Sequence, residues 1–348
     1  MTVTAGKLWG LRRLADENGR FKMTAVDQRP PIKQLIAGAR GMDVADDEDV
    51  GAVKRLLVEE LSADSSALLL DPHHAYPAAI DAVPPAKGLL LTLEDSIFDE
   101  TTGGRRSSEI PNWSVEKIKR SGADAVKLLA WYRPDVSDEI RDHQQEFVTR
   151  VGDACRRFDI PFVFELLTYP LPGDADNPEH EAARRAEHVI RSVEEFSDPR
   201  YGVDLFKLES PVPPDSVPDP ADPEAGPPIQ EIFDELGRAA ARPWVMLSAG
   251  ADRSAFRRIL TFAYRAGASG FLAGRTIWWG PLQQFPDMDA ARHELRTEGV
   301  AYLREIADLT DAIASPFPED PSYGDDGPVL AGDLSDFRST YHDFGGVT

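Results

Sequence analysis

The sequence contains a single cysteine, Cys155, and no long hydrophobic run. One cysteine cannot form an intramolecular disulfide, and Cys155 lies in a charged stretch of helical pattern, so we assign it a structural role and expect a reducing cytoplasm. No run of about 18 apolar residues is present, as a membrane span would require. Lys7, Arg12 and Arg13 interrupt the N-terminal region, so a signal peptide is not expected there.

Positive charge is also scarce. The chain carries 38 basic residues against 60 acidic ones, which gives a formal net charge of −22. Such a surface repels nucleic acids and anionic membranes, so neither is expected as a partner. An anionic substrate would therefore need a local positive pocket. We interpret the acidic clusters at residues 43–49 and 215–224 as solvated surface rather than as metal sites.

Short apolar runs alternate along the chain with segments of helical period. The alternation indicates parallel βαβ units. The eight predicted strands are residues 23–28, 67–71, 88–94, 125–132, 162–169, 205–211, 244–250 and 270–278. The predicted helices are residues 50–62, 114–121, 139–158, 178–196, 229–240 and 253–266.

Eight such strands, without a division into two halves, favour a closed barrel over a doubly wound sheet. The predicted fold class is α/β, a single (β/α)8 TIM barrel. We expect the barrel to occupy residues 1–314 and an irregular, acidic C-terminal extension to occupy residues 315–348, with no second domain. Tyr323, Phe337, Tyr341 and Phe344 predict that parts of this extension dock on the rest of the molecule.

Two lysines lie inside predicted strands, Lys127 and Lys207, and Lys207 is the only lysine after position 127. Burial can lower a lysine pKa by several units from about 10.4, which yields a free amine that attacks carbonyls. The pattern therefore predicts a Schiff-base enzyme, with Lys207 as nucleophile and Lys127 as a second cation that disfavours protonation of that amine. The alternative is that both lysines form structural ion pairs.

Chemistry in a barrel is expected at the carboxyl ends of the strands, and these ends are polar. Glu165 lies on the strand between those of Lys127 and Lys207, where it either shuttles protons or only neutralises the lysines. The strand-end residues are Asp27, Gln28, Asp71, Glu94, Lys127, Glu165, Lys207, Glu209, Ser248, Gly250, Gly274 and Arg275.

The ends of the seventh and eighth predicted strands have the features of an anion site. Ser248 and Gly250 precede a predicted helix, and Gly274 precedes Arg275. Small residues let backbone N–H groups approach an oxyanion, and the guanidinium adds positive charge. Barrel enzymes frequently bind phosphate at this place.

Other polar features leave alternatives open. The adjacent His73 and His74 point in opposite directions on an extended chain and have no third histidine near a strand end, so a zinc site is not predicted. The acidic strand ends would instead suit Mg²⁺ in a barrel lyase. The Pro-rich residues 211–228 exclude regular structure and predict either an active-site cover or a passive surface loop.

Seven short motifs occur in order over most of residues 8–310. They are Gly10-Leu11-Arg12-Arg13-Leu14, Ala25-Val26-Asp27-Gln28-Arg29, Val126-Lys127-Leu128-Leu129, Phe164-Glu165-Leu166-Leu167-Thr168-Tyr169, Leu205-Phe206-Lys207-Leu208-Glu209-Ser210-Pro211, Leu247-Ser248-Ala249-Gly250 and Ala273-Gly274-Arg275. As a set, they resemble the class I tagatose-1,6-bisphosphate aldolase family, which includes the related sulfofructose-phosphate aldolases.

The resemblance implies a (β/α)8 barrel that uses no metal and no other cofactor. Lys207 would form the Schiff base and Glu165 would be the acid/base, while Lys127 and Asp27 would assist carbinolamine formation and proton transfer. The substrate is implied to be a small sugar phosphate. The residues implied to contact it are Gln28, Arg29, Ser248, Gly250, Gly274 and Arg275.

Two departures from the family pattern bear on the substrate. Pro30-Pro31 stands where relatives usually carry Gly-Ser, close to Arg29 and the expected C6 end of the sugar. The stretch from Thr276 to Trp279 replaces an ending that usually carries a lysine. The reaction type therefore transfers better than the substrate.

We expect a cytoplasmic, homo-oligomeric class I aldolase that reversibly cleaves a ketohexose 1,6-bisphosphate of the tagatose or fructose type. The products would be dihydroxyacetone phosphate and an aldehyde. Three alternatives remain open: a 6-deoxy-6-sulfofructose-1-phosphate aldolase, a Mg²⁺-dependent barrel lyase, and a non-catalytic regulator that binds sugar phosphates.

Overall fold

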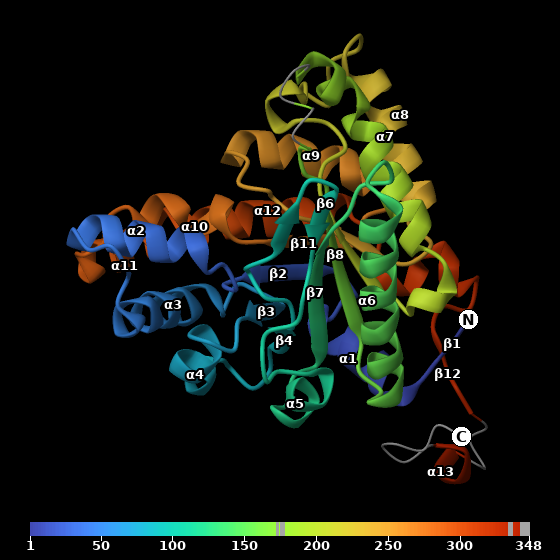
Figure 1. The fold of residues 1–348 in the computed structure, drawn as a ribbon, viewed down its shortest axis with the longest axis horizontal. Coiled ribbons are helices and arrows are strands. Elements are labelled where there is room, and N and C mark those ends of the chain that lie inside the picture. The colour runs from blue at the N-terminus through green and yellow to red at the C-terminus, as the bar shows by residue number, and fades with distance from the viewer. Residues whose placement is uncertain (172–173, 175–177, 333–336, 342–348) are drawn as a thin grey trace.

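Eight parallel strands close into a barrel in the computed structural model, which describes residues 1–171, 174, 178–332 and 337–341 (Figure 1). Each strand pairs with the next barrel strand along the chain, and the last pairs with the first. The strands are β2 (Phe21–Ala25), β3 (Ala67–Leu70), β4 (Gly88–Thr92), β7 (Ala125–Trp131), β8 (Phe162–Leu167), β9 (Leu205–Leu208), β10 (Trp244–Met246) and β11 (Gly270–Ala273). The predicted (β/α)8 fold is confirmed.

Helices surround the barrel, and no helix in the described part of the chain is long and apolar enough to cross a membrane. The α-helices are α1 (Ala5–Leu14), α2 (Pro30–Arg40), α3 (Asp47–Leu61), α4 (Ala75–Ala79), α5 (Val115–Arg120), α6 (Asp138–Arg157), α7 (Pro178–Phe196), α8 (Gly226–Ala239), α9 (Arg253–Arg265), α10 (Arg275–Leu282), α11 (Met288–Glu294), α12 (Val300–Ile313) and α13 (Phe337–Thr340). A π-helical turn, η5 (Leu295–Gly299), joins α11 to α12.

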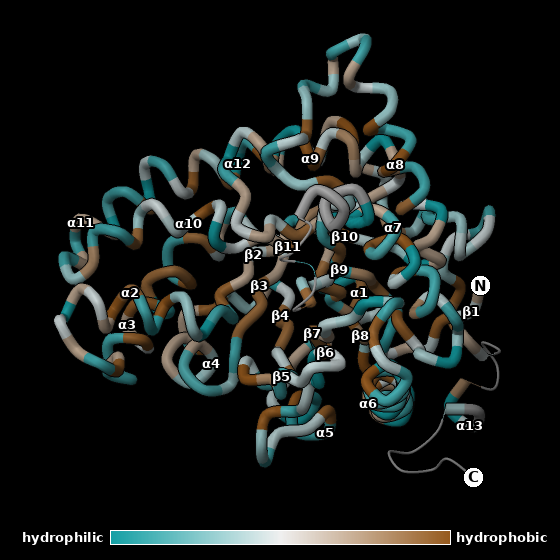
Figure 2. The backbone as a smooth tube through the Cα atoms, turned by 45° about the horizontal axis from the view of Figure 1, so that its top comes forward, coloured by the Kyte–Doolittle hydropathy of each residue, from teal (hydrophilic) through white to brown (hydrophobic). Residues whose placement is uncertain are grey.

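The barrel strands are hydrophobic on both faces because both faces are buried. On β3, Leu69 packs inside the barrel, whereas Leu68 and Leu70 pack in the layer between strands and helices. This alternation follows from the two-residue period of a strand. Figure 2 shows hydrophobic stretches along the central strands, while the surrounding helices alternate between hydrophobic and hydrophilic segments. The interior therefore holds the strands in one register and fixes where each strand ends.

The eighth barrel strand is shorter than predicted. β11 ends at Ala273, and residues 275–278 form the first turn of α10, so the prediction of a strand to residue 278 was wrong. Thr276, Ile277 and Trp278 are all buried in this turn. The indole nitrogen Nε1 of Trp278 donates to the backbone carbonyl of Ala25 at 3.0 Å. A short apolar run does not by itself distinguish a buried helical turn from a strand.

The Pro-rich segment after β9 is partly regular. It contains the 3-10 turn η4 (Pro214–Ser216), and α8 begins at Gly226, so the exclusion of regular structure over residues 211–228 was wrong at its C-terminal end. Proline is tolerated in the first turn of a helix, where no intrahelical N–H bond is lost. The segment is held against α9, because Arg258 donates to the carbonyl of Val217 and Arg265 donates to that of Pro220.

The described part of the C-terminal extension closes the N-terminal end of the barrel. A two-residue strand, β12 (Val329–Leu330), pairs in parallel with β1 (Thr2–Val3). Phe317 and Tyr323 are buried and pack in the same cluster as Phe21 at the start of β2. Further on, the hydroxyl of Tyr341 donates to Asp159 and its ring packs on Phe337. Phe344 lies outside the described residues.

Candidate active site

A carboxylate lies between two buried lysines at the carboxyl ends of β7, β8 and β9. Glu165 on β8 is opposite Lys207 on β9 in the strand register. Its Oε2 atom is 2.8 Å from Nζ of Lys207 and 2.8 Å from Nζ of Lys127 on β7. The structure thus brings together the three side chains that the sequence placed on three neighbouring strands. The second carboxylate oxygen, Oε1, makes no hydrogen bond to any residue in the described part of the chain.

Lys127 is enclosed by three carboxylates. Its Nζ lies 3.0 Å from Asp27, 2.6 Å from Glu94 and 2.8 Å from Glu165, and the side chain is almost fully buried. Burial alone would lower the pKa of Lys127, but the negative charges of Asp27, Glu165 and Glu94 raise it well above its usual range. These contacts therefore favour the protonated form of Lys127, which leaves Lys207 as the candidate for the free amine that attacks a carbonyl.

The carboxylates beside the lysines are ionised. Burial alone would raise the pKa of Asp27, but the charges of Lys127 and Lys207 lower it to about 2. Burial opposes ionisation of Glu165 as well, yet the same two lysines hold the pKa of Glu165 below its usual value. Glu165 is thus a proton acceptor at neutral pH, as a general base must be.

Glu94 completes this cluster, although the sequence marked it only as one of several acidic strand ends. Its carboxylate accepts from the hydroxyl of Thr92 at 2.8 Å and from the backbone N–H of Leu129 at 3.0 Å. Both terminal nitrogens of the buried Arg29 donate to the backbone carbonyl of Glu94 at 3.1 Å. Arg29 keeps one donor, Nε, without a hydrogen-bond partner among the described residues.

The acidic strand ends each face a lysine or an arginine. Asp71 pairs with the buried Lys54 of α3, and Glu209 pairs with Arg185 while accepting from the backbone N–H and the hydroxyl of Thr168. Burial alone would raise the pKa of Asp71, but hydrogen bonds from His74 and Lys54 hold it below its usual range. Asp71 and Glu209 are thus each compensated in place, and neither belongs to the group of carboxylates around Lys127.

Lys54 is a fully buried lysine that sequence reasoning missed. Lys54 lies on α3, and the hydrophobic periodicity of a helical sequence does not reveal whether a lysine within it is buried. Its Nζ also donates to the carbonyl of Val26 at 3.0 Å, so it joins α3 to the end of β2. The neighbouring His74 hydrogen-bonds Asp47 through Nε2 at 2.8 Å. We interpret this group as structural support beneath the site.

A cavity of about 240 Å³ opens beside the lysine cluster. Its lining includes Lys207 and Glu165 together with residues at the ends of β10 and β11. Lys127 does not line this cavity. It is buried, and its ion pair with Glu165 connects it to the cavity wall. The predicted residues on the cavity wall are Gln28, Glu165, Lys207, Glu209, Ser248, Gly274 and Arg275.

The wall formed by the ends of β10 and β11 has an unusual backbone. Ala249 has φ 47° and Gly250 has φ 83°, both in the left-handed region. A non-glycine residue held there costs on the order of 1 kcal/mol, and such strain clusters at ligand-binding sites. A Cβ atom on Gly250 would lie 3.3 Å from Cζ of Arg275, so the absence of a side chain lets this guanidinium lie against the loop.

Arg275 is the first residue of α10 rather than the end of a strand, and it hydrogen-bonds no residue in the described part of the chain. Within that part it also has no carboxylate at salt-bridge distance. A partly exposed guanidinium of this kind is ready to bind an anion. The structure therefore brings Arg275 together with Ser248 and Gly250, as the sequence predicted.

A β-hairpin that the sequence did not predict lies over the ends of β7 and β8 (Figure 1). Its strands are β5 (Asp99–Thr101) and β6 (Gly104–Arg106). The guanidinium of Arg105 lies 4.5, 4.6 and 4.8 Å from the ring centres of Phe98, Trp131 and Tyr169. Trp131 also lines the cavity. Through Trp131, the hairpin thus packs beside the mouth of the cavity.

Comparison with known proteins gives one consistent family. The sequence model of the DeoC/LacD family of aldolases matches residues 21–280. A protein named tagatose 1,6-diphosphate aldolase from Listeria monocytogenes serotype 4a (strain HCC23) is 36% identical over 322 residues, which cover 90% of this chain and 94% of that protein. A protein of the same name from Lactococcus lactis subsp. lactis is 35% identical over 329 residues, which cover 92% and 99%.

Solved structures show the same barrel. A fructose-bisphosphate aldolase from Plasmodium falciparum matches with a TM-score of 0.65 and 13% identity, over 90% of this chain and 98% of that one. A fructose-1,6-bisphosphate aldolase described as Schiff base forming matches with a TM-score of 0.56 and 17% identity, over 87% and 98%. At these identities the two structures support the fold alone.

Proposed function

This chain belongs to the DeoC/LacD family of aldolases, and from this premise we propose that it works by the class I mechanism, with Lys207 as the amine that forms an imine. One observation carries the proposal: a single oxygen of Glu165 lies 2.8 Å from Nζ of both Lys207 and Lys127. The arrangement supplies a nucleophile, a protonated lysine beside it, and an ionised base between them.

The proposed reaction begins when the amine of Lys207 adds to the C2 carbonyl of a ketose phosphate. The carbinolamine loses water to give a protonated imine, assisted by Lys127 and Asp27 as proton donor and acceptor. Glu165 then removes the C4 hydroxyl proton, the C3–C4 bond breaks, and its electron pair moves into the imine to give an enamine. The aldehyde leaves, C3 is protonated, and hydrolysis of the imine releases dihydroxyacetone phosphate and restores Lys207.

We propose a ketohexose 1,6-bisphosphate of the tagatose or fructose type as the substrate. The names of the relatives support this class, and the uncompensated guanidinium of Arg275 beside Ser248 and Gly250 suits the C1 phosphate. Gln28 and Gly274 contribute to the same wall. Arg29, with its unpartnered Nε, is proposed for the C6 end. Assaying triose release from tagatose bisphosphate, fructose bisphosphate and 6-deoxy-6-sulfofructose 1-phosphate tests this assignment and its sulfonate alternative.

Borohydride trapping tests the nucleophile without knowledge of the full sugar. Borohydride added with dihydroxyacetone phosphate should leave one stable adduct, and peptide mass mapping should place it on Lys207. Reactions without the ligand, and reactions with Lys207→Arg, should give none, because a guanidinium does not deprotonate in proteins. An adduct on Lys127, or no adduct on an active enzyme, would contradict the mechanism.

We further propose that the enzyme acts in the cytoplasm as a homo-oligomer, with residues 1–314 as the barrel and 315–348 as its extension. Light scattering coupled to size-exclusion chromatography measures the oligomeric state directly, and a monomeric mass at working concentration would overturn that part of the proposal.

A further inference from the structure

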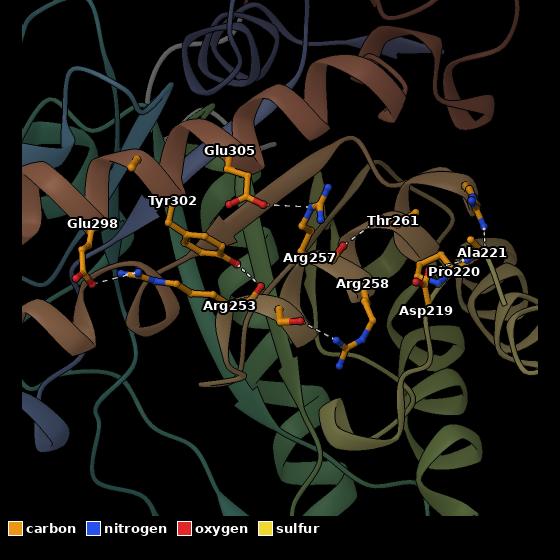
Figure 3. Close-up of a pocket in the computed structure, with 13 residues that line it drawn as sticks. Asp219, Pro220, Ala221, Arg253, Arg257, Arg258, Thr261, Glu298, Tyr302 and Glu305 are labelled. Carbon is orange, nitrogen blue, oxygen red and sulfur yellow. Dashed lines mark hydrogen bonds and ion pairs between the residues drawn. The ribbon is translucent and has the colours of Figure 1, made fainter.

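A groove of about 740 Å³ lies on the outside of the barrel, between α9, α12 and the segment after β9 (Figure 3). Four arginines of α9 line it: Arg253, Arg257, Arg258 and Arg265. Arg253 and Arg257 are four residues apart, so they are neighbours on the surface of the helix. The groove is separate from the cavity that holds Lys207, and the proposed reaction makes no use of it.

Two of these arginines form exposed ion pairs with glutamates of the groove. Nη1 of Arg253 is 3.4 Å from Glu298, and Nε of Arg257 is 3.2 Å from Glu305. The arginine side chains are 36% and 59% exposed, and their partners are more than half exposed. Exposed pairs of this kind contribute about 0–1 kcal/mol, so a multiply charged anion can replace the glutamates at low cost.

The other two arginines carry charge that no carboxylate compensates among the described residues. Arg258 donates to the carbonyl of Val217 and to the hydroxyl of Ser254, both at 2.8 Å, and Arg265 donates to the carbonyl of Pro220 at 3.0 Å. These hydrogen bonds hold both side chains at the groove. Their acceptors are neutral oxygens, which do not compensate the positive charge of the guanidinium groups. The carboxylates of Asp219, Glu298 and Glu305 also line the groove, so its four guanidinium groups outnumber its carboxylates by one (4 − 3), in a chain whose net charge is −22.

Arg253 links the groove to the proposed phosphate wall of the active site. Its guanidinium donates to the backbone carbonyls of Thr276 and Ile277, both at 3.4 Å, in the first turn of the helix that begins with Arg275. A second cavity, of about 830 Å³, is lined by Arg253 and Glu298 together with Gly250 and Arg275. A ligand that draws Arg253 away from Glu298 therefore changes the contacts of Arg253 with the first turn of α10 and with the cavity that Gly250 and Arg275 line.

We propose that the groove is a regulatory site for a small molecule with two or more phosphoryl groups, and that Arg253 transmits its occupancy to the loop at Gly250 and to Arg275. Arginine suits such a ligand because its planar fork binds phosphoryl oxygens in pairs. The binding half of the proposal is independent of the mechanism assigned to Lys207. The coupling half needs only that the enzyme cleaves a phosphorylated sugar.

Isothermal titration calorimetry with inorganic pyrophosphate, at constant ionic strength, tests the binding half. The wild-type protein should bind, and Arg257→Gln/Arg258→Gln should bind at least tenfold more weakly. Arg275→Ala removes the active-site cation and should change the groove affinity by less than twofold. Arg304→Gln is the matched control, because this arginine of α12 is 65% exposed and pairs with Asp64 away from the groove.

Three results would overturn the proposal: no binding, loss of binding in Arg275→Ala alone, or equal weakening in the Arg304→Gln control. The single variant Arg257→Gln guards against a folding defect, because its guanidinium pairs only with Glu305 among the described residues, and a three- to tenfold loss is expected from it.

Steady-state kinetics test the coupling half. Saturating pyrophosphate should change KM for the sugar phosphate at least twofold more in the wild-type enzyme than in Arg257→Gln/Arg258→Gln, with a smaller effect on kcat. Coupling between two binding sites is reciprocal, so the substrate should shift the pyrophosphate affinity by the same factor. A KM that responds equally in both proteins would show that the groove is not connected to the active site, and would refute this half.

Discussion

Replacing Glu165 by glutamine separates the two chemical roles assigned to this side chain. The substitution keeps the size and one hydrogen-bonding oxygen but removes the proton acceptor. The cluster around it contains three cations, Lys127, Lys207 and Arg29, and three carboxylates, Asp27, Glu94 and Glu165. After the substitution two carboxylates face three cations.

The expected loss of turnover follows from the role of Glu165 as a general base. A positioned general base contributes about 10²–10⁴ to turnover. At about 1.36 kcal/mol for each factor of ten, this equals roughly 3–5 kcal/mol of the barrier to C3–C4 cleavage. Imine formation should respond differently, because Lys207 loses its one described carboxylate partner and the excess positive charge is relieved when its amine is free. Trapping by borohydride should therefore persist in Glu165→Gln and should extend to lower pH than in the wild type.

Two measurements check this separation. A coupled assay of triose phosphate release gives kcat, and mass spectrometry after borohydride treatment gives the trapped fraction as a function of pH. The matched control is Glu209→Gln, which makes the same chemical change on the same cavity wall without contact to a lysine. This control should lower kcat by less than tenfold and should leave the pH dependence of trapping in place.

Near-normal turnover in Glu165→Gln would refute the reasoning. Glu165 would then be only a charge partner for the lysines, and Asp27 or Glu209 would become the candidate base. Loss of trapping together with turnover would refute it in another way, since it would mean that Glu165 is needed for attack by Lys207.

Four further predictions concern metal dependence, stability, acidity and substrate. Activity should survive exhaustive EDTA treatment, because the imine takes the place of a Lewis acid; rescue of a lost activity by Mg²⁺ would favour the lyase alternative. Lys54→Met should lower the free energy of unfolding in urea by about 3–5 kcal/mol, because the buried Asp71 loses its ammonium partner and keeps, among the described residues, only the hydrogen bonds from the segment at His73 and His74, and Lys54→Met/Asp71→Asn should recover part of that loss. The pKa of Asp27 is lowered from 3.8 to about 2 on folding, so its stabilisation is present above pH 3.8 and is lost as pH falls towards 2. Asp27→Asn should remove this contribution, which is on the order of 2 kcal/mol, and should flatten this part of an acid-unfolding profile. Arg275→Ala should raise KM for every ketose 1-phosphate, whereas Arg29→Ala should penalise C6-charged sugars by about 1.5–3 kcal/mol more than uncharged ones, and equal effects would show that Arg29 does not contact C6.

The fold and the lysine cluster were accessible from the sequence because their signals are local. Each barrel strand is an apolar run between turn-forming residues, and each approximate position was right. Lys127, Glu165 and Lys207 stand out because a charged residue inside an apolar run has few structural explanations. Their mutual distances then follow from the spacing of neighbouring parallel strands, which is about 5 Å.

Other parts of the site depend on contacts between distant segments. Arg105 belongs to a hairpin of two three-residue strands, too short to give a period, and its aromatic enclosure joins Phe98, Trp131 and Tyr169 from separate segments. Lys54 lies on a helix, and only the position of Asp71 at the end of β3 explains its burial. The strained Ala249 gives no sequence signal, because alanine is common in every backbone conformation except the one it adopts here.

The pairing of β1 with β12 has a consequence for the order of folding. Thr2 and Val329 are 327 positions apart (329 − 2), so the first strand of the chain has to wait for almost the whole sequence to be synthesised before its partner exists. Closing a loop of that length costs about 4 kcal/mol more than closing a five-residue hairpin, at about 0.6 kcal/mol for each of roughly six doublings. A two-residue ladder does not supply this by itself, so the pair forms only when Phe317 and Tyr323 have already docked beneath the finished barrel. A chain that lacks Phe317 and Tyr323 would therefore expose the apolar underside of the barrel around Phe21.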